Sequence, residues 1–413
     1  MVRPTKRGDG RDLVTKWFLP YLDGSRPWLD PDNFPKRSAD PNGYEVRSGK
    51  GKGKVEVLEG ESELLERIRQ RPFADWMGLP GRDHLLPSAL ASKPPSDEVN
   101  ALRRRRHLHS LRRNGLYLIL GLSYLAYDLI AGEGRVAFLI VIGLFLIVAR
   151  PMMEALIGVR ETQKSVSPEL RAQRQAEWIL FLGWLETRPA RRIKVGLWIL
   201  VGIFVIQVLK SPEGILTALL LAPLFEPAAL IPDRVNEGEW WRLLTAGFLH
   251  GFVIHIWFNG TALYDLGRIL AAILRPGVLA FVFLVSVLVG SIASWLLPPD
   301  SISVGASGGI LGVLGFLAVL TWRKSTRLPQ ALRLRVGFSI GLITLLGVLG
   351  AQLIDNAAHG GGFLAGVILA LLLPRSARIW NAGTSPWWRW VGGLSALVLA
   401  AGAIKAIYEL LTH

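Results

Sequence analysis

The sequence predicts an all-α, polytopic membrane protein with a small polar region ahead of its membrane helices. Hydrophobic residues make up 51% of the 413 residues, and the mean hydropathy is +0.35. Several apolar runs approach the length of about 20 residues that a helix needs to cross a bilayer. Lysine and arginine gather in segments between these runs, as is typical of cytoplasmic loops.

Charge and cysteine content exclude several classes of site. The formal net charge is +15, which we attribute to loops that face anionic lipid rather than to nucleic-acid binding. The sequence has no cysteine, which excludes a disulfide framework, a thiolate metal site and a cysteine nucleophile. We expect no nucleic-acid partner.

Residues 1–110 are predicted to be a soluble, partly disordered region that stays in the cytoplasm, because they are polar and lack a signal-peptide core. Residues 44–58 are predicted to be structured. The lysine–glycine run at 49–54 within them suits a hairpin loop or a flexible linker, and a helix is expected near 61–71. A nucleotide-binding loop is excluded because no strand–loop–helix pattern surrounds this run.

Residues 111–190 are predicted to hold two extra membrane helices, at about 115–132 and 136–157, and a basic cytoplasmic loop. An arginine-rich block at 103–113 leads into the first helix, and we interpret it as a cytoplasmic anchor rather than an RNA-binding patch. The apolar stretch at 178–185 is too short to cross, so we expect it to lie on the membrane surface.

Seven further spans are predicted, at about 194–209, 243–266, 277–297, 304–322, 335–353, 357–373 and 390–408. The first six fall within 191–376 and the seventh within 377–413. The loop at 323–335 is strongly basic and the one at 298–300 is not. The charge pattern therefore predicts nine crossings in total, with the N-terminus in the cytoplasm and the C-terminus outside.

The span near 304 opens with a serine among glycines. Ser307 is flanked by Gly305 and Gly308, and Gly309 and Gly312 follow. Glycine costs about 1 kcal/mol relative to alanine inside a helix, but small residues allow membrane helices to pack closely. Taken alone, this pattern indicates helix packing with an incidental serine.

The span near 357 opens with a histidine beside a second small-residue face. His359 is followed by Gly362 and Gly366, which are four residues apart. A histidine inside a membrane segment is a functional-site candidate. Two glycine-faced helices can pack so that Ser307 and His359 meet, which would form a minimal pair of nucleophile and general base.

These residues resemble the rhomboid family of intramembrane serine proteases over about residues 192–374. The resemblance rests on four motifs in family order: Gly305-x-Ser307-Gly308, His359-x-x-Gly362-x-x-x-Gly366, His255-Ile256-Trp257-Phe258-Asn259 and Trp241-Arg242. It implies a rhomboid-like six-helix catalytic core at 191–376, with the extra helices at 111–190 before it and one at 377–413 after it. The long connection at 210–240 matches the family's loop after its first core helix, which lies partly in the outer leaflet.

The resemblance also implies the chemistry. Ser307 would be the nucleophile and His359 the general base, with no metal or organic cofactor. Asn259, His255 and the Ser307 amide would stabilise the oxyanion. Glycines would pack the helices at the site, namely Gly305, Gly308, Gly312, Gly362 and Gly366. Substrates would be membrane proteins with unstable transmembrane helices, cut within the lipid bilayer by an integral multi-pass protein, which we expect in a bacterial plasma membrane.

Two positions leave questions open. Leu311 stands where the family often has a tyrosine that stacks on the base, so His359 would be held by aliphatic contacts, by Phe363 or by another aromatic ring. Asp355 lies four residues before His359 and could orient its ring, although we favour a helix cap formed by Asp355 or Asn356.

Other functions remain to be weighed against proteolysis. The Asn–His pair could belong to a buried hydrogen-bond network between helices. A rhomboid-like protein that binds membrane clients without cutting them is the main alternative, and retention of Ser307 and His359 argues against it. A transporter or a bis-histidine haem protein is a second alternative, which the glycine faces do not support.

Overall fold

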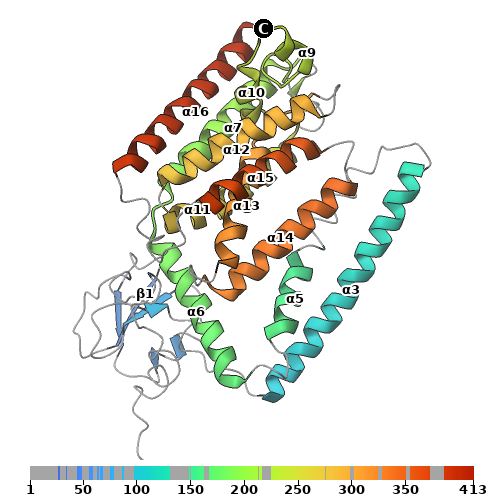
Figure 1. Ribbon diagram of the computed structural model, residues 1–413. Coiled ribbons are helices and arrows are strands. Elements are labelled where there is room, and N and C mark those ends of the chain that lie inside the picture. Colours follow the sequence, from blue (N-terminus) through green and yellow to red (C-terminus); the bar gives the residue numbers. More distant parts are fainter. Residues whose placement is uncertain are drawn as a thin grey trace, which may run out of the picture. The chain divides into compact units, whose positions relative to one another are not determined.

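The structure is a computed structural model that describes residues 27, 34, 44–48, 55–58, 63–64, 66–67, 75–78, 86–87, 97–130, 148, 150–161, 167–212, 214–215, 225–274, 276–297, 302–323, 328–349, 354–372 and 386–413. It is mostly helical (Figure 1). The chain divides into two compact units. The first contains residues 1–124, 143–189 and 329–331, and the second contains residues 125–142, 190–328 and 332–413.

The first unit contains a small antiparallel sheet with strand order β2-β1-β3-β4. β1 (Tyr44–Ser48) pairs with β2 (Val55–Leu58), so residues 44–58 are structured as predicted, and the lysine–glycine run at 49–54 lies outside the described residues. β3 (Asp75–Gly78) and β4 (Leu86–Pro87) were not predicted. Trp76 and Met77 are buried in β3, and their burial explains why so short a strand forms.

Three long helices belong to this unit, α3 up to residue 124, and residues 63–64 and 66–67 are helical within the helix expected near 61–71. α3 (Asp97–Ile130) joins the arginine-rich block and the first predicted membrane run in one helix. α5 (Arg150–Glu161) overlaps the end of the second run, and residues 136–147 of that run lie outside the described residues. α6 (Pro168–Thr187) begins where the Ser167 hydroxyl accepts a hydrogen bond from the Leu170 amide (3.2 Å), an N-cap interaction.

Residues 178–185, which we predicted to lie on the membrane surface, belong to a helix longer than the apolar stretch itself. They form part of the 20-residue helix α6. Phe181 and Trp184 are fully buried, and their rings are 5.8 Å apart. This apolar face is therefore covered by protein.

The second unit holds helices that overlap all seven spans predicted after residue 190. They are α7 (Arg191–Lys210), α11 (Val253–Leu274), α12 (Pro276–Leu296), α13 (Ser307–Trp322), α14 (Gln330–Leu349, in this unit from residue 332), α15 (Asn356–Leu372) and α16 (Pro386–Thr412).

Among the described residues, four of these helices are long and apolar enough to cross a membrane, namely α7, α12, α14 and α16. A fifth span results if α11 is counted with the bent segment before it. α13 and α15 are apolar but shorter. An integral, multi-pass helical protein is thus supported, with fewer spans that meet these criteria than the nine crossings predicted.

The span predicted to begin at 243 is bent. α10 (Arg242–Thr245) and η5 (Ala246–Phe248) meet α11 at an angle of 94°. Leu249 is extended, and the Gln207 side chain hydrogen-bonds both the amide and the carbonyl of His250 (3.1 and 3.3 Å). The two hydrogen bonds from Gln207 on α7 stabilise the bend. They satisfy the backbone amide and carbonyl of His250, which a continuous helix would pair within itself.

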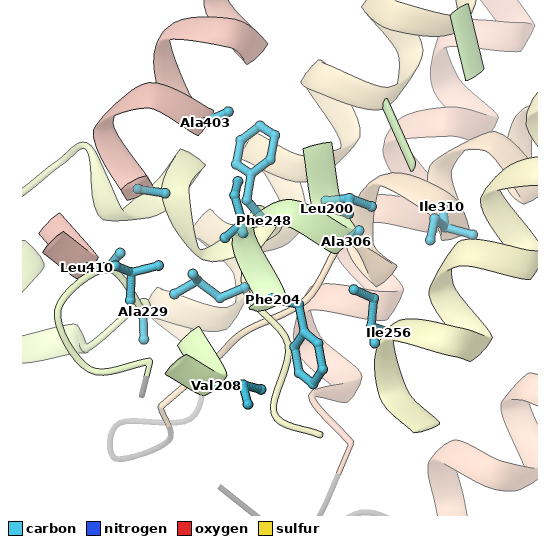
Figure 2. Close-up of a cluster of buried hydrophobic side chains, with 14 residues drawn as sticks. Leu200, Phe204, Val208, Ala229, Phe248, Ile256, Ala306, Ile310, Ala403 and Leu410 are labelled. Carbon is cyan, nitrogen blue, oxygen red and sulfur yellow. The ribbon is translucent and has the colours of Figure 1, made fainter. Parts of the chain in front are cut away.

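A cluster of buried apolar side chains joins α7, η5, α11, α13 and α16 (Figure 2). Phe204 of α7, Phe248 of η5 and Leu410 of α16 belong to it. So does Ala306, the residue that precedes Ser307. The start of α13 is therefore packed into the core of the second unit.

Candidate active site

α13 and α15 lie side by side (Figure 1) and pack through the glycines predicted for this role. A methyl group on Gly362 would lie 2.9 Å from the Gly308 Cα atom, and one on Gly366 would lie 2.8 Å from the Gly312 Cα atom. Both distances are below the 3.0 Å that real Cβ atoms essentially never cross. The two backbones therefore touch, as small residues allow in membrane helices.

α12 meets these two helices at the level of the predicted dyad. A methyl group on Gly290 of α12 would lie 2.7 Å from the Ala358 carbonyl oxygen and 3.5 Å from the Gly308 Cα atom. Ala358 precedes His359, and Gly308 follows Ser307. Ser307 and His359 thus stand at the same level of adjacent helices, and both are half-buried.

Gly305 lies in the loop before α13, although the helical span was predicted to begin near residue 304. Its φ angle is +129°, a conformation that favours glycine. Its amide donates to the Ala246 carbonyl at 2.9 Å, which ties the loop to η5. A methyl group here would lie 2.9 Å from His255 Nε2 and 3.5 Å from Asn259 Nδ2. Only a glycine leaves both side chains open toward the turn that precedes Ser307.

His255 and Asn259 lie on one face of α11, as their spacing of four predicts. Asn259 is buried, and its Nδ2 has no hydrogen-bond partner among the described residues. A buried amide donor without a partner is costly, so such a group calls for an explanation. The structure thus brings His255 and Asn259 to the turn before α13, the helix that packs on α15.

His250 neighbours this pair. Its ring packs edge-on against the His255 ring, with 5.1 Å between centroids. The His250 side chain is fully buried, and its ring nitrogens have no partner within the described part of the chain. Its backbone is held by Gln207, a residue that the sequence analysis did not single out.

Asp355 caps α15, and this confirms the role we favoured for it. Its Oδ1 atom accepts from the Ala358 amide at 2.8 Å. Its Oδ2 atom accepts from the hydroxyls of Ser294 and Ser303, both at 2.5 Å. No hydrogen bond joins this carboxylate to the His359 ring among the described residues, so the structure favours the cap over the ring-orienting alternative. Ser294 and Ser303 were missed because only tertiary structure brings them to Asp355.

Two further expectations concern the surroundings of the dyad. Leu311 is buried at the position where a tyrosine was the family's frequent choice. The Phe363 side chain lies against Gly315, since a methyl group there would be 3.2 Å from Phe363 Cδ2. Gly315 is about two helical turns from Ser307. Phe363 therefore packs toward the middle of α13.

The Trp241-Arg242 motif fixes the connection that precedes the bent span. The guanidinium of Arg242 is buried and donates to the carbonyl oxygens of Glu226 and Ala229 at 2.8 and 2.7 Å. It also pairs with Glu239 at 2.5 Å. One side chain thus organises the chain from 226 to 242, as bidentate donors can.

Comparison with known proteins finds a family match over this part of the chain. Residues 237–376 match the Rhomboid domain. The matched segment contains the four contacting glycines, Ser307, His359, His255 and Asn259.

Several relatives with rhomboid names also match part of the chain. Rhomboid protease GluP of Bacillus subtilis (strain 168) is 35% identical over 147 residues, which cover 34% of this chain and 27% of that protein. RHOMBOID-like protein 5 of Arabidopsis thaliana is 32% identical over 198 residues, 45% of this chain and 60% of that protein. Putative rhomboid protease YdcA of Bacillus subtilis (strain 168) is 27% identical over 139 residues, which cover 33% of this chain and 69% of that protein. The chain thus spans only 27% and 60% of the length of the first two relatives.

Proposed function

We propose that the protein is an intramembrane serine endopeptidase that uses a Ser307–His359 dyad. The observation that carries this proposal is that α13 packs on both α15 and α11. A serine and a histidine stand on helices whose backbones touch, and the Asn259 amide donor, which has no partner among the described residues, lies beside the glycine turn before the serine. The rhomboid domain and the relatives named proteases support the same reaction class.

In the proposed reaction, Ser307 Oγ attacks the carbonyl carbon of the scissile peptide while His359 takes the hydroxyl proton. The resulting imidazolium then gives its proton to the leaving amine. Water hydrolyses the acyl-enzyme in a second cycle with His359 again as base. Both oxygens of Asp355 are occupied elsewhere, so the proposal needs no third catalytic group.

Negative charge develops on the carbonyl oxygen in the tetrahedral intermediate, and donors must be aimed at that position. Asn259 Nδ2 is free to donate within the described residues, and His255 lies beside it next to Gly305. The Ser307 amide is the third donor in the proposal. Because these groups sit on packed helices, they need no rearrangement when the charge appears.

Water must reach the site, and helix length supports its access. α13 has 16 residues, which corresponds to about 24 Å, whereas the hydrocarbon core is about 30 Å thick. One end of α13 therefore lies below the bilayer surface. We place Ser307 on the extracytoplasmic side because the loop after α13 is strongly basic, with the N-terminus in the cytoplasm.

The proposed substrates are membrane proteins whose transmembrane helices unwind easily, because an extended peptide must enter the site. The test compares membrane-protein fragments from cells that carry the wild-type chain or Ser307→Ala. Fragments that end inside or beside apolar segments should depend on Ser307. An identical set of fragments in both strains would instead favour a non-cleaving, client-binding protein.

A further inference from the structure

Asp355 joins three separate segments of the second unit. Its carboxylate accepts from the Ala358 amide in the first turn of α15, from Ser294 on α12, and from Ser303 in the segment before α13. Ser294 is fully buried. The two hydroxyls reach one oxygen atom at 2.5 Å, which is the range of hydrogen bonds to an ionised carboxylate.

The Asp355 carboxylate and its three donors, which we call the Asp355 clamp, lie close in sequence to both members of the dyad. Asp355 lies four residues before His359, and Ser303 lies four residues before Ser307. One hydrogen bond, from Ser303 Oγ to Asp355 Oδ2, therefore connects the segment that precedes Ser307 to the segment that precedes His359. The backbone of Ser303 also pairs with Leu230 through two bonds of 3.0 and 3.1 Å, so the anchor extends to the connection after α7.

A simple helix cap would not need this arrangement. Capping α15 uses Oδ1 alone, and the Ala358 amide satisfies that atom. The second oxygen makes no contribution to the cap, yet it receives two side-chain donors from positions 52 and 61 residues away in sequence. No ion pair of Asp355 occurs in the described ranges, so hydroxyl and amide donors alone solvate the carboxylate there.

We propose that Asp355 is a positioning residue for the reaction: through Ser303 it holds the loop that carries Ser307 in register with the helix that carries His359. This inference rests on the proposed dyad chemistry and adds a residue to it. The physical reason is that a misplacement of about 1 Å between reacting groups can cost on the order of 100-fold in rate. The packing of α13 on α15 fixes the positions of these two helices relative to each other. The loop at 302–306 precedes α13 and is held by the hydrogen bonds of its own residues, such as those of Ser303 and Gly305.

The two serines provide a matched pair of variants. Ser303→Ala and Ser294→Ala each remove one hydroxyl from the same oxygen of Asp355, but only Ser303 leads to Ser307. We expect Ser303→Ala to lower kcat at least 10-fold with KM unchanged, and Ser294→Ala to stay within about threefold of wild type. Both should lower Tm by similar amounts. Ser303→Thr, which keeps the hydroxyl, should restore most of kcat.

The carboxylate itself is tested by Asp355→Asn and Asp355→Ala. The amide of asparagine can still accept from Ala358 with its oxygen and donate toward the two serine oxygens with its nitrogen. We therefore expect Asp355→Asn to retain more kcat than Asp355→Ala. The double variant Asp355→Ala, Ser303→Ala should be no slower than Asp355→Ala alone, since both act through one bond.

The measurements are kcat and KM on a membrane-protein substrate, the rate of fluorophosphonate labelling of Ser307, and Tm, all with the full chain. Equal kcat for Ser303→Ala and Ser294→Ala, or activity losses that follow Tm across the series, would overturn the positioning role while leaving the dyad intact. If the wild-type chain neither cleaves nor is labelled at Ser307, the proposed function falls, and this inference falls with it.

Discussion

Asn259 offers the sharpest residue-scale prediction because its Nδ2 donor has no partner among the described residues. If that donor serves the oxyanion, Asn259→Ala should lower kcat roughly 100- to 1,000-fold, about 3–4 kcal/mol, with KM little changed. The Ser307 amide remains in this variant, so turnover should be slow but measurable. Steady-state kinetics and a melting curve on the same preparation provide the check.

Two other outcomes would reassign Asn259. A raised KM with kcat intact would place the residue in substrate binding. A fall in Tm that accounts for the lost activity would instead favour the interhelical hydrogen-bond network.

Gly305 provides a second prediction at this scale. Gly305→Ala should inactivate the protein about 100-fold, because the added methyl group would enter the space next to His255 and Asn259. The matched control is Gly238→Ala. Gly238 has a φ angle of +103°, so alanine is strained there too, but no atom lies within 4 Å of the added methyl group.

Both alanine variants should lower stability by about 1–3 kcal/mol, the usual range for a strained backbone position. Only the Gly305 variant should lose activity in excess of its stability loss. Comparable activity in the two variants would refute the idea that the space beside Gly305 belongs to the site.

At the scale of elements, the contact between α13 and α15 sets the distance between the dyad residues. Gly366→Leu should inactivate the protein although Gly366 touches no reacting atom, because its Cβ would overlap the Gly312 carbonyl. Gly360→Leu is the control on the same helix, since Gly360 is exposed and has no atom within 4 Å of an added Cβ. Cleavage assays on both variants in membranes are the measurement, and equal activity would contradict this account of the helix contact.

The helices themselves could be predicted because apolar runs and basic loops are visible in sequence. Every span predicted after residue 190 overlaps a helix. The 94° bend before α11 could not be predicted, since it depends on bonds from Gln207 to the His250 backbone. Strand β3 was equally hidden, because four residues with two buried side chains give no clear alternation.

The candidate site was also predicted only in part from the sequence. Ser307, His359, His255 and Asn259 were singled out because their types and spacings carry chemistry. The loop position of Gly305 was missed, since the apolar run gives no sign that the helix begins at Ser307 rather than near residue 304. The Asp355 clamp was missed because its partners are 52 and 61 residues distant in sequence and meet only in the folded chain.

At the scale of the whole molecule, the proposal fixes an orientation in the membrane. A tag inserted within residues 323–329, between α13 and α14, should be protected from an impermeant reagent added outside intact cells, because this connection is strongly basic. A tag at 299–301 should be labelled. The reverse pattern would place Ser307 near the cytoplasm and contradict the proposed route of water to the site.

The central claim is that Ser307 is a nucleophile activated by His359, and covalent labelling tests it most directly. The full chain is treated with a fluorophosphonate in native membranes, and the adduct is mapped by mass spectrometry in wild type, His359→Ala and Gly360→Ala, the last as a neutral control on the same helix. We predict an adduct on Ser307 in wild type and in the control, and a loss of at least 100-fold in labelling rate in His359→Ala. An adduct on another serine, or unchanged labelling of Ser307 without His359, would contradict the account.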